Sequence, residues 1–319
     1  MSSPPAAIDP SRGATRLAGW FAGLAVVVWC LLVFGATVRV HGAGLSCPDW
    51  PLCYGEFIPQ FNPWIVLEWG HRLLAGAVSV GFLVLGGLVL RDPALRSRAG
   101  GLVAAAAATL VLQIVLGGLT VLALLAYWSV TLHLMTGNLF LWLVLSIRAR
   151  LAQGSEIGAP IAHSVRSLVV AAALLWGVQM TLGGLVSSNG AGLACAEWPT
   201  CNDGAWVPGF VGGVGLQLFH RLGAYTLFAV IVALAWSVRR DAGARRWGGA
   251  ALLLTVLQVS LGVANVLLKL PAEIAIAHSA VGDLLGVTLI GALWHILPRP
   301  VAAAAPARGS LVAPDLERA

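Results

Sequence analysis

Four of the seven histidines lie inside long apolar segments, where an ionisable side chain is rare. Each sits about four to seven residues from one end of its predicted helix, which at roughly 1.5 Å per residue is one to two turns from the same membrane surface. Ionisable groups inside a bilayer are costly and usually functional. One such histidine could equally be a hydrogen-bonded core residue, but four at one depth, two in each half of the chain, favour a shared chemical role. They are His71, His133, His220 and His278.

Two imidazoles that project from facing helices into a bundle form a bis-histidine haem site. Copper and zinc also accept imidazole, but each half offers only two histidines at this depth and no matching third ligand. Haem needs only two axial ligands, and it fills the apolar space between four helices. We therefore predict one haem in each half. Glycines that would help to open this space, although glycine is common at helix contacts in membranes, are Gly117, Gly118, Gly137 and Gly262.

An arginine follows one histidine of each pair: Arg72 comes directly after His71, and Arg221 directly after His220. An arginine at this depth needs an anion, and haem propionates would supply one through bidentate contacts. The alternative is a side chain that extends to the headgroups at the nearby membrane surface. Both interpretations stay open at the level of the sequence.

Glu68 precedes His71 by three residues, so both side chains share one helix face. The corresponding residue of the second half is Gln217. A carboxylate beside only one haem pocket predicts that one half carries chemistry and the other a permanent electron-transfer haem. Glu68 would then act as a base or stabilise a developing cation; the alternative is a simple salt bridge to the neighbouring arginine. Asp283 corresponds in the repeat to Asn138 of the first half. We expect Asp283 only to hydrogen-bond within the bundle.

Two cysteine pairs with the spacing C-x5-C occupy the two long loops: Cys47 with Cys53, and Cys195 with Cys201. An oxidising outer compartment makes two disulfides the default expectation. A zinc site shared by the four cysteines is the competing idea, but C-x5-C is not the usual short zinc motif. A disulfide here is either a structural staple or, if exposed, a reducible redox group.

The elements that position these residues are membrane helices. Of 319 residues, 59% are hydrophobic and 10% are charged, and the mean hydropathy is +0.88. A soluble domain usually carries about 25% charge, so water is not the main solvent. The uncharged stretch 102–147 is too long for one span of about 20 residues; we place its turn at 126–128, and the equivalent later turn at 269–271. The predicted spans are residues 18–38, 64–90, 101–126, 128–147, 167–187, 214–238, 247–268 and 274–296.

The placement of Lys and Arg predicts the orientation of these spans. One set of connections is basic, whereas the opposite set holds little beyond Arg39 and Lys269. We therefore expect a protein of the cell inner membrane with both termini cytoplasmic and the loops 41–63 and 188–213 facing outward. The basic charge is a topology signal and requires no nucleic-acid partner. The basic connections contain Arg12, Arg16, Arg91, Arg96, Arg98, Arg148, Arg150, Arg166, Arg239, Arg240, Arg245, Arg246 and Arg299.

An internal repeat organises the chain. Residues 42–53 match residues 190–201 at an offset of 148, the two His-Arg-Leu motifs match at 149, and His133 matches His278 at 145. An even number of helices per half makes this a parallel repeat. The predicted fold is thus an all-α integral membrane protein, with eight transmembrane helices in two tandem four-helix bundles related by a pseudo-twofold axis along the membrane normal. Its parts are the halves 1–148 and 167–297, a cytoplasmic linker 149–166 and a cytoplasmic tail 298–319.

Taken together, these motifs resemble the haem A synthase family over essentially the whole chain apart from its tails. The resemblance is carried by the E-x-x-H-R motif that ends at Arg72, by Phe219-His220-Arg221, by His133 and His278, and by both C-x5-C loops. The family has eight spans in two four-helix halves, with histidines on the even-numbered spans.

The resemblance implies an activity and its partners: oxidation of a methyl group of haem O to the formyl group of haem A, for terminal cytochrome oxidases. His71 and His133, with Glu68, would hold the substrate haem, which haem O synthase would deliver. His220 and His278 would ligate haem b as the electron-relaying cofactor. The Cys47/Cys53 pair would handle redox chemistry near the substrate. Membrane lipids surround the protein, while an electron donor or acceptor and a homo-oligomeric partner are left open.

Two other functions compete with this interpretation. A di-haem b-type electron carrier would share the histidines. However, electron transfer without substrate chemistry needs no carboxylate in one half only, such as Glu68. A transporter would fit the tandem repeat, but transporters usually show broken helices and polar residues at the membrane midplane. The polar residues here lie near one surface instead.

Overall fold

The computed structural model describes residues 10–152 and 163–296, and the regular structure within these ranges is almost entirely α-helical. All eight of its α-helices are long and apolar enough to cross a membrane. One short 3-10 turn, η1 (Ala191–Leu193), lies in the second long loop. The helices are α1 (Pro10–Val40), α2 (Pro63–Arg91), α3 (Pro93–Leu122), α4 (Tyr127–Ala152), α5 (His163–Ser188), α6 (Gly212–Val238), α7 (Arg245–Leu267) and α8 (Ala272–Ile296).

Proline and a capping side chain begin two of the first-half helices. Pro63 and Pro93 occupy the first turns of α2 and α3, where a residue without an N–H leaves no hydrogen bond unmade. The Asn62 side chain accepts a hydrogen bond from the N–H of Ile65 at 2.9 Å, and Asp92 caps α3 in the same way. Because α3 begins at this cap, it starts well before residue 101, where we predicted the third span.

The turn between α3 and α4 covers residues 123–126, so our prediction of 126–128 placed it too late. Leu124 and Leu125 both adopt positive φ, at 51° and 59°. Their counterparts between α7 and α8, Lys269 and Leu270, adopt 62° and 60°. Non-glycine residues rarely take this conformation, and leucine is not a residue type that marks a turn. The sequence therefore carries no signal for the first of these turns.

The predicted linker 149–166 is partly helical. Helix α4 continues to Ala152 and α5 already begins at His163. Residues 153–162 between them and the predicted tail 298–319 lie outside the described residues, as do Arg299 and the side chain of Arg12.

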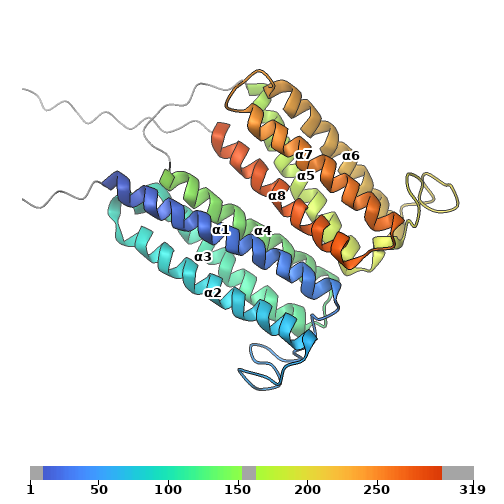
Figure 1. Ribbon diagram of the computed structural model, residues 1–319, viewed down its shortest axis with the longest axis horizontal. Helices are drawn as coiled ribbons and strands as arrows, with labels where there is room; N and C mark the ends of the chain where they lie inside the picture. The colour runs from blue at the N-terminus through green and yellow to red at the C-terminus, as the bar shows by residue number, and fades with distance from the viewer. Residues whose placement is uncertain (1–9, 153–162, 297–319) are drawn as a thin grey trace, which may run out of the picture.

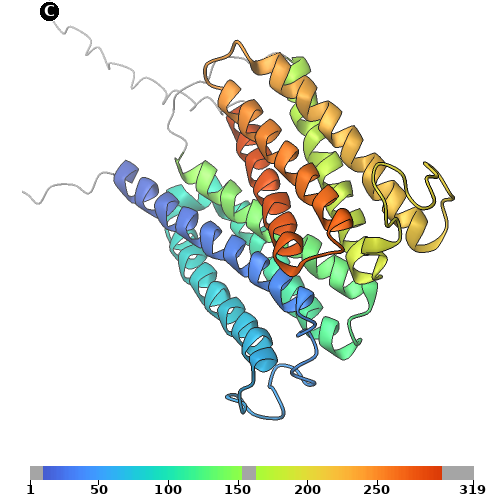
Figure 2. The ribbon, with the colours of Figure 1, turned by 45° about the vertical axis from the view of Figure 1, so that its right-hand side comes forward.

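The eight helices run roughly along one direction in two groups of four, α1–α4 and α5–α8, as Figures 1 and 2 both show. The groups meet through α1 and α4 on one side and α5 and α8 on the other. We call the end that carries the loops 41–62 and 189–211 the loop face. The opposite end, where α1 begins and α8 ends, is the terminal face.

Each group has an apolar core that lies toward the terminal face. In the first half the buried cluster covers residues 14–28, 78–89, 95–110 and 140–151, and Phe82 meets Phe140 edge to face at 5.2 Å. The buried clusters of the second half occupy the corresponding parts of α5–α8. All four histidines of interest lie beyond these cores, nearer the loop face.

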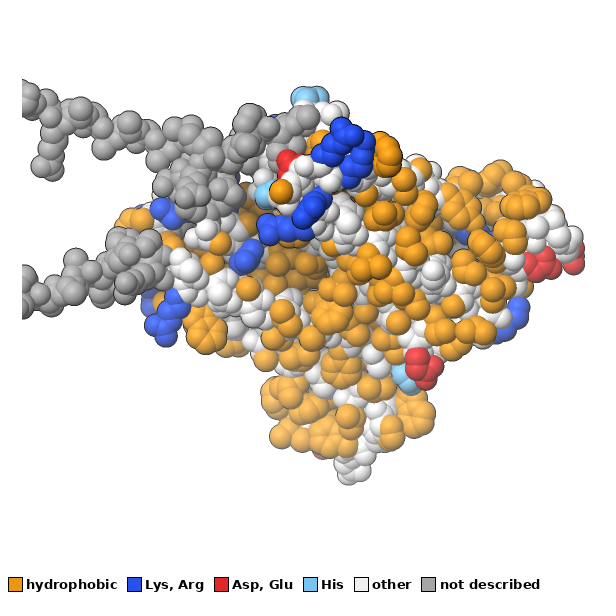
Figure 3. Space-filling view, turned by 45° about the horizontal axis from the view of Figure 1, so that its top comes forward, with side chains coloured by type: hydrophobic (Ala, Val, Ile, Leu, Met, Phe, Trp, Pro, Cys, Tyr) orange, Lys and Arg blue, Asp and Glu red, His pale blue; other side chains and the backbone are white. Residues whose placement is uncertain are grey.

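The outer surface of the helices matches a membrane environment. Figure 3 shows apolar side chains over most of the visible face, with Lys and Arg gathered mainly toward the terminal face. Exposed aliphatic and aromatic residues such as Trp20, Leu83 and Trp236 point outward from the bundle. In water such a surface would be costly, whereas in lipid it is the expected one.

Candidate haem sites

Each of the four histidine rings lies against a glycine on the preceding helix. A Cβ atom added at any of these glycines would approach the ring Cε1 atom to 3.1–3.2 Å, closer than real side chains normally pack. The glycines therefore form a cradle that only a residue without a side chain can provide. The pairs are Gly35 with His71, Gly117 with His133, Gly183 with His220 and Gly262 with His278.

The second-half pair has the spacing that a bis-histidine haem requires. An iron–imidazole bond is about 2 Å long and the ring centre lies roughly 1 Å further, so two axial imidazoles have centres about 6 Å apart. The ring centroids of His220 and His278 are 6.5 Å apart, with their planes at 66°. The separation of the two ring centroids is therefore close to that of two imidazoles on one iron atom.

The first-half pair lies in a comparable place. His71 lies on α2 and His133 on α4, each against a glycine of the preceding helix, as in the second half. The Nδ1 atoms of both rings, and that of His278, are buried and have no hydrogen-bond partner among the described residues. Buried polar atoms of this kind are rare and call for an explanation.

Three glutamine side chains approach the histidine rings from the odd-numbered helices, and sequence reasoning did not predict these contacts. Each contact joins an amide nitrogen to a ring nitrogen. Gln113 contacts His133 at 3.4 Å, Gln179 contacts His220 at 3.0 Å, and Gln258 contacts His278 at 3.2 Å. None of the described residues hydrogen-bonds the ring of His71 in this way.

Arg72 fastens the first disulfide loop to α2. Its guanidinium donates to the backbone carbonyls of Asp49 at 2.8 Å, Leu52 at 2.7 Å and Cys47 at 3.1 Å, and to Glu68 Oε1 at 2.5 Å. Arginine suits this task because its donors are fixed in a planar fork. The side chain thus turns toward the loop rather than running out to headgroups, and the predicted propionate contact stays a prediction.

Arg221 repeats this arrangement in the second half. It donates to the carbonyls of Thr200 at 2.8 Å, Cys195 at 3.0 Å and Glu197 at 2.8 Å. The repeat therefore extends from the motifs to the way in which each loop is held above its histidine pair.

Glu68 and Gln217 are both buried, but they bind their loops with opposite polarity. Glu68 Oε2 accepts the N–H of Cys47 at 2.7 Å, in addition to its salt bridge with Arg72. Gln217 instead donates to the carbonyl of Gly192 at 2.7 Å. The salt bridge that we considered as an alternative is therefore present, and it places the carboxylate next to the first cysteine of the loop.

Both predicted disulfides are present, Cys47–Cys53 and Cys195–Cys201, so the four cysteines do not form a shared zinc site in this structure. All four cysteines are buried, with exposed fractions of 1% or less. The condition under which we considered a reducible disulfide, exposure of the pair, is therefore not met in this structure.

An acidic residue organises the tip of each loop. Asp49 Oδ2 accepts the N–H of Gly55 at 2.7 Å, and this bond, with further loop N–H groups, holds the pKa of Asp49 below its usual value. Glu197 does the same in the second loop, where the N–H of Gly204 and then the Thr200 hydroxyl lower the pKa of its carboxyl. The charged forms thus hold both loops in shape.

Asp283 and Asn138, which are repeat counterparts, meet at the contact between the two halves. Both are almost fully buried, and the Asn138 amide lies close to the Asp283 carboxylate across the boundary between the halves. The expectation that Asp283 hydrogen-bonds within the bundle stays a prediction.

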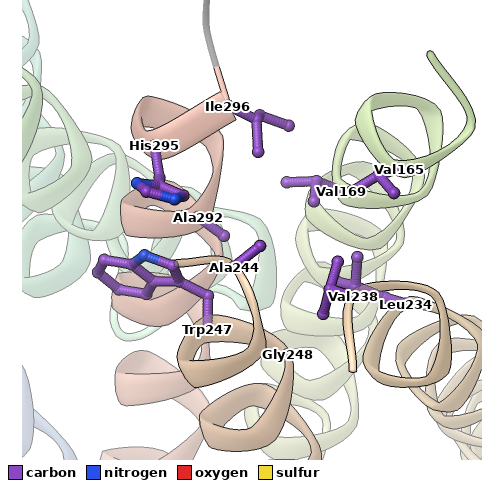
Figure 4. Close-up of a pocket in the computed structure, with 10 residues that line it drawn as sticks. All are labelled: Val165, Val169, Leu234, Val238, Ala244, Trp247, Gly248, Ala292, His295 and Ile296. Carbon is purple, nitrogen blue, oxygen red and sulfur yellow. The ribbon is translucent and has the colours of Figure 1, made fainter. Parts of the chain in front are cut away.

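A separate pocket, drawn in Figure 4, lies at the terminal face of the second half. Apolar side chains such as Val169, Leu234 and Ile296 line it, together with Trp247 and His295. Its volume of about 10 Å³ holds one water at most. It lies at the opposite end of the helices from His220 and His278, and we assign it no role.

Fold and site together define a multi-pass helical membrane protein whose tandem halves each bury paired imidazoles beneath a disulfide loop. The chain belongs to the cytochrome oxidase assembly protein family, whose model matches residues 18–65 and 60–290. This confirms the resemblance that the histidine and cysteine motifs indicated.

Curated relatives match along most of their length. A heme A synthase of Shewanella oneidensis is 30% identical, covering 86% of this chain and 96% of its own. One of Methylorubrum extorquens is 30% identical over 98% of this chain and 94% of its own. A third, of Symbiobacterium thermophilum, is 32% identical over 78% and 83%.

Proposed function

We propose that this protein is a haem A synthase, a membrane oxidoreductase that converts the methyl group of haem O into the formyl group of haem A. The observation that carries the proposal is the cradled histidine pair in each half, with a 6.5 Å separation of ring centroids in the second. The names of the curated relatives support the same reaction.

We assign the substrate haem to the first half, with His71 and His133 as its ligands. Glu68 is the reason for this choice, because it is a buried carboxylate whose counterpart, Gln217, is neutral. Glu68 would accept a proton or stabilise positive charge as the methyl group is oxidised. Its bonds to Cys47 and Arg72 hold it at a fixed place beside the loop.

The second half would hold haem b between His220 and His278. When bound, that haem supplies one-electron redox chemistry. The protein's own contribution is to hold the two imidazoles at the required spacing and to keep the disulfide loop over them through the hydrogen bonds of Arg221. Arg72 and Arg221 directly follow the ligands His71 and His220. A haem propionate would be a further hydrogen-bond acceptor for each guanidinium, besides the backbone carbonyls.

The remaining assignments follow the family and the charge pattern. Haem O synthase would deliver the substrate, and the Cys47–Cys53 disulfide would handle redox equivalents once its loop opens. The terminal face, where most of the arginines lie, would be cytoplasmic. The domains are then a catalytic half 1–148 and a haem b half 167–297.

A di-haem electron carrier remains the second candidate, because the histidine pairs alone would serve it equally well. The test separates the two through Glu68. The wild type, Glu68→Gln and the matched control Gln217→Glu are expressed with a haem O source, and the haems are extracted and quantified. We expect Glu68→Gln to lose most haem A while both histidine pairs still bind haem, and Gln217→Glu to retain synthesis. An unchanged yield of haem A in Glu68→Gln would show that the carboxylate takes no part in the chemistry. If no sample contains haem A, including the wild type, the result favours the di-haem electron carrier.

A further inference from the structure

His71 and His220 are repeat counterparts, yet their surroundings differ. Both rings lie on a glycine of the preceding helix, Gly35 in α1 and Gly183 in α5. One turn before this glycine stands Leu31 in the first half but Gln179 in the second. The difference therefore replaces an apolar side chain with an amide at equivalent places.

The Gln179 amide is bonded closely to His220. Its nitrogen lies 3.0 Å from Nδ1 of the ring and donates to the His220 carbonyl at 2.9 Å. Gly223, three residues after the histidine, makes room for this amide, because a Cβ there would lie 2.4 Å from Gln179 Oε1. The corresponding first-half residue is Leu74. Two separate substitutions between the halves thus produce one polar niche.

The oxygen of this amide is an acceptor that lacks a donor. Gln179 Oε1 is buried and has no hydrogen-bond partner among the described residues. An imidazole that binds a metal through one nitrogen carries its proton on the other, and an acceptor for that proton fixes the ring orientation. The amide nitrogen that contacts Nδ1 in this structure cannot accept that proton, whereas Oε1 can. Once a metal binds Nε2, a turn of the terminal amide would therefore bring Oε1 to Nδ1–H as the acceptor that holds the ring of His220.

His71 has only apolar neighbours in the equivalent places. Its ring packs edge to face against Phe34 at 5.8 Å, and none of the described residues hydrogen-bonds it. Such contacts fill space but do not fix the rotation of a ring. A cofactor that stays bound needs a fixed ligand, whereas a substrate must enter and its product must leave.

We propose that Gln179 and Gly223 form a positioning pair that holds His220 as a permanent axial ligand, and that Leu31 and Leu74 leave His71 free to exchange its haem. This inference rests on the proposed function, since it takes the first-half haem to be the substrate. Helices α1 and α5 carry no haem ligand. Their residues Leu31 and Gln179 would nevertheless determine how long each haem stays bound.

The test measures haem loss from each half of the full-length protein separately. A His71→Ala background reports on the second half and a His220→Ala background on the first, with excess apomyoglobin as the haem acceptor. We expect Gln179→Leu to speed haem loss from the second half about tenfold, the usual size of an outer-shell effect. Leu31→Gln combined with Leu74→Gly should slow loss from the first half severalfold. Gln179→Glu, which retains an acceptor oxygen, should keep the slow rate.

A spectroscopic readout separates positioning from general loosening. The low-spin ferric EPR signal of the second-half haem depends on the orientation of its two imidazole planes, so it should change in Gln179→Leu. Should that variant fail to fold, Gly223→Ala makes the same test, because its methyl group displaces the amide.

The outcomes distinguish this inference from the function on which it rests. If His220→Ala keeps the second-half haem with an unchanged EPR signal, His220 is not its ligand and the proposed ligand pair is wrong. If His220→Ala loses that haem but Gln179→Leu and Gly223→Ala change neither the rate of loss nor the EPR signal, only the positioning pair is overturned.

Discussion

At the scale of single residues, the glycines beneath the histidines constrain the sites most tightly. A methyl group at Gly262 would lie 3.1 Å from Cε1 of His278, so Gly262→Ala must push the ring away from its place. We expect the haem content of the second half to fall severalfold, as measured by pyridine haemochrome per protein. Gly249→Ala is the control on the same helix, because its Cβ would meet no described atom within 4 Å. Equal haem content in both variants would show that the contact between Gly262 and the His278 ring is not needed for haem binding.

The two loop-binding arginines allow a second prediction at this scale. Lysine presents its donors from one nitrogen rather than from a planar fork that spans separate acceptors, so Arg72→Lys should loosen the first loop and leave the second unchanged. Losing these bonds should cost about 1–3 kcal/mol. Hydrogen exchange followed by mass spectrometry would report faster exchange in residues 47–56, and Arg221→Lys should show the reverse pattern. Unaltered exchange in both loops contradicts this role.

The sequence identified the histidines, arginines, cysteines and Glu68 because their residue types are unusual in a membrane. It did not identify Gly35, Gly183 or Gln179, since glycine and glutamine carry no such signal. Their importance appears only when the contacts show which helix faces which ring. An offset of 148 relates the two glycines and would have been a clue.

At the scale of elements, the disulfide loops depend on ionised carboxylates at their tips. The lowered pKa of Asp49 means that its contribution to loop stability is present above its usual value near 3.8 and is lost as the pH falls through the lower folded value. We expect pepsin to cleave the first loop increasingly as the pH drops below about 4. In Asp49→Asn the loop should already be cleaved at higher pH, with a weaker dependence on acid. The same cleavage profile in both proteins would rule out the carboxylate as the cause.

Helix boundaries were predictable where proline or a change of composition marks them, as at Pro63. They were not predictable at residues 123–126, where two leucines adopt positive φ. Leu125 reaches Gly44 of the first loop and Leu270 reaches Gly192 of the second. The unusual backbone therefore directs an apolar side chain from each turn into the neighbouring loop, a tertiary contact that local sequence cannot reveal.

At the scale of the whole molecule, nearly constant offsets between motifs predicted two four-helix groups, but not how the groups pack. Two indole N–H groups hydrogen-bond across that contact. Trp29 donates to the carbonyl of Ala280 at 3.2 Å, and Trp294 donates to Ser146 at 2.8 Å. Tryptophan alone does not indicate such a partner, because it is equally common at the membrane surface.

The pair formed by Asp283 and Asn138 gives the last prediction, because it joins symmetry-related positions at the centre of this contact. One oxygen of each side chain, Oδ1 in both, is buried without a partner among the described residues. Asp283→Asn would add a donor for the unpartnered Asn138 oxygen, so we expect this variant to be at least as stable as the wild type. Asp283→Leu removes the polar group that faces Asn138 and should cost about 0.5–2 kcal/mol, the range for polar side-chain contacts between membrane helices.

Thermal unfolding in detergent, followed by circular dichroism, would measure both variants, with haem content as the companion readout. The halves should separate more readily in Asp283→Leu, while each histidine pair, which lies within a single half, keeps its haem. A leucine variant as stable as the wild type would mean that the apolar contacts around the pair hold the halves together without it. An asparagine variant that is clearly less stable would instead mean that the carboxylate itself is required at this buried position, in spite of the cost of placing it there.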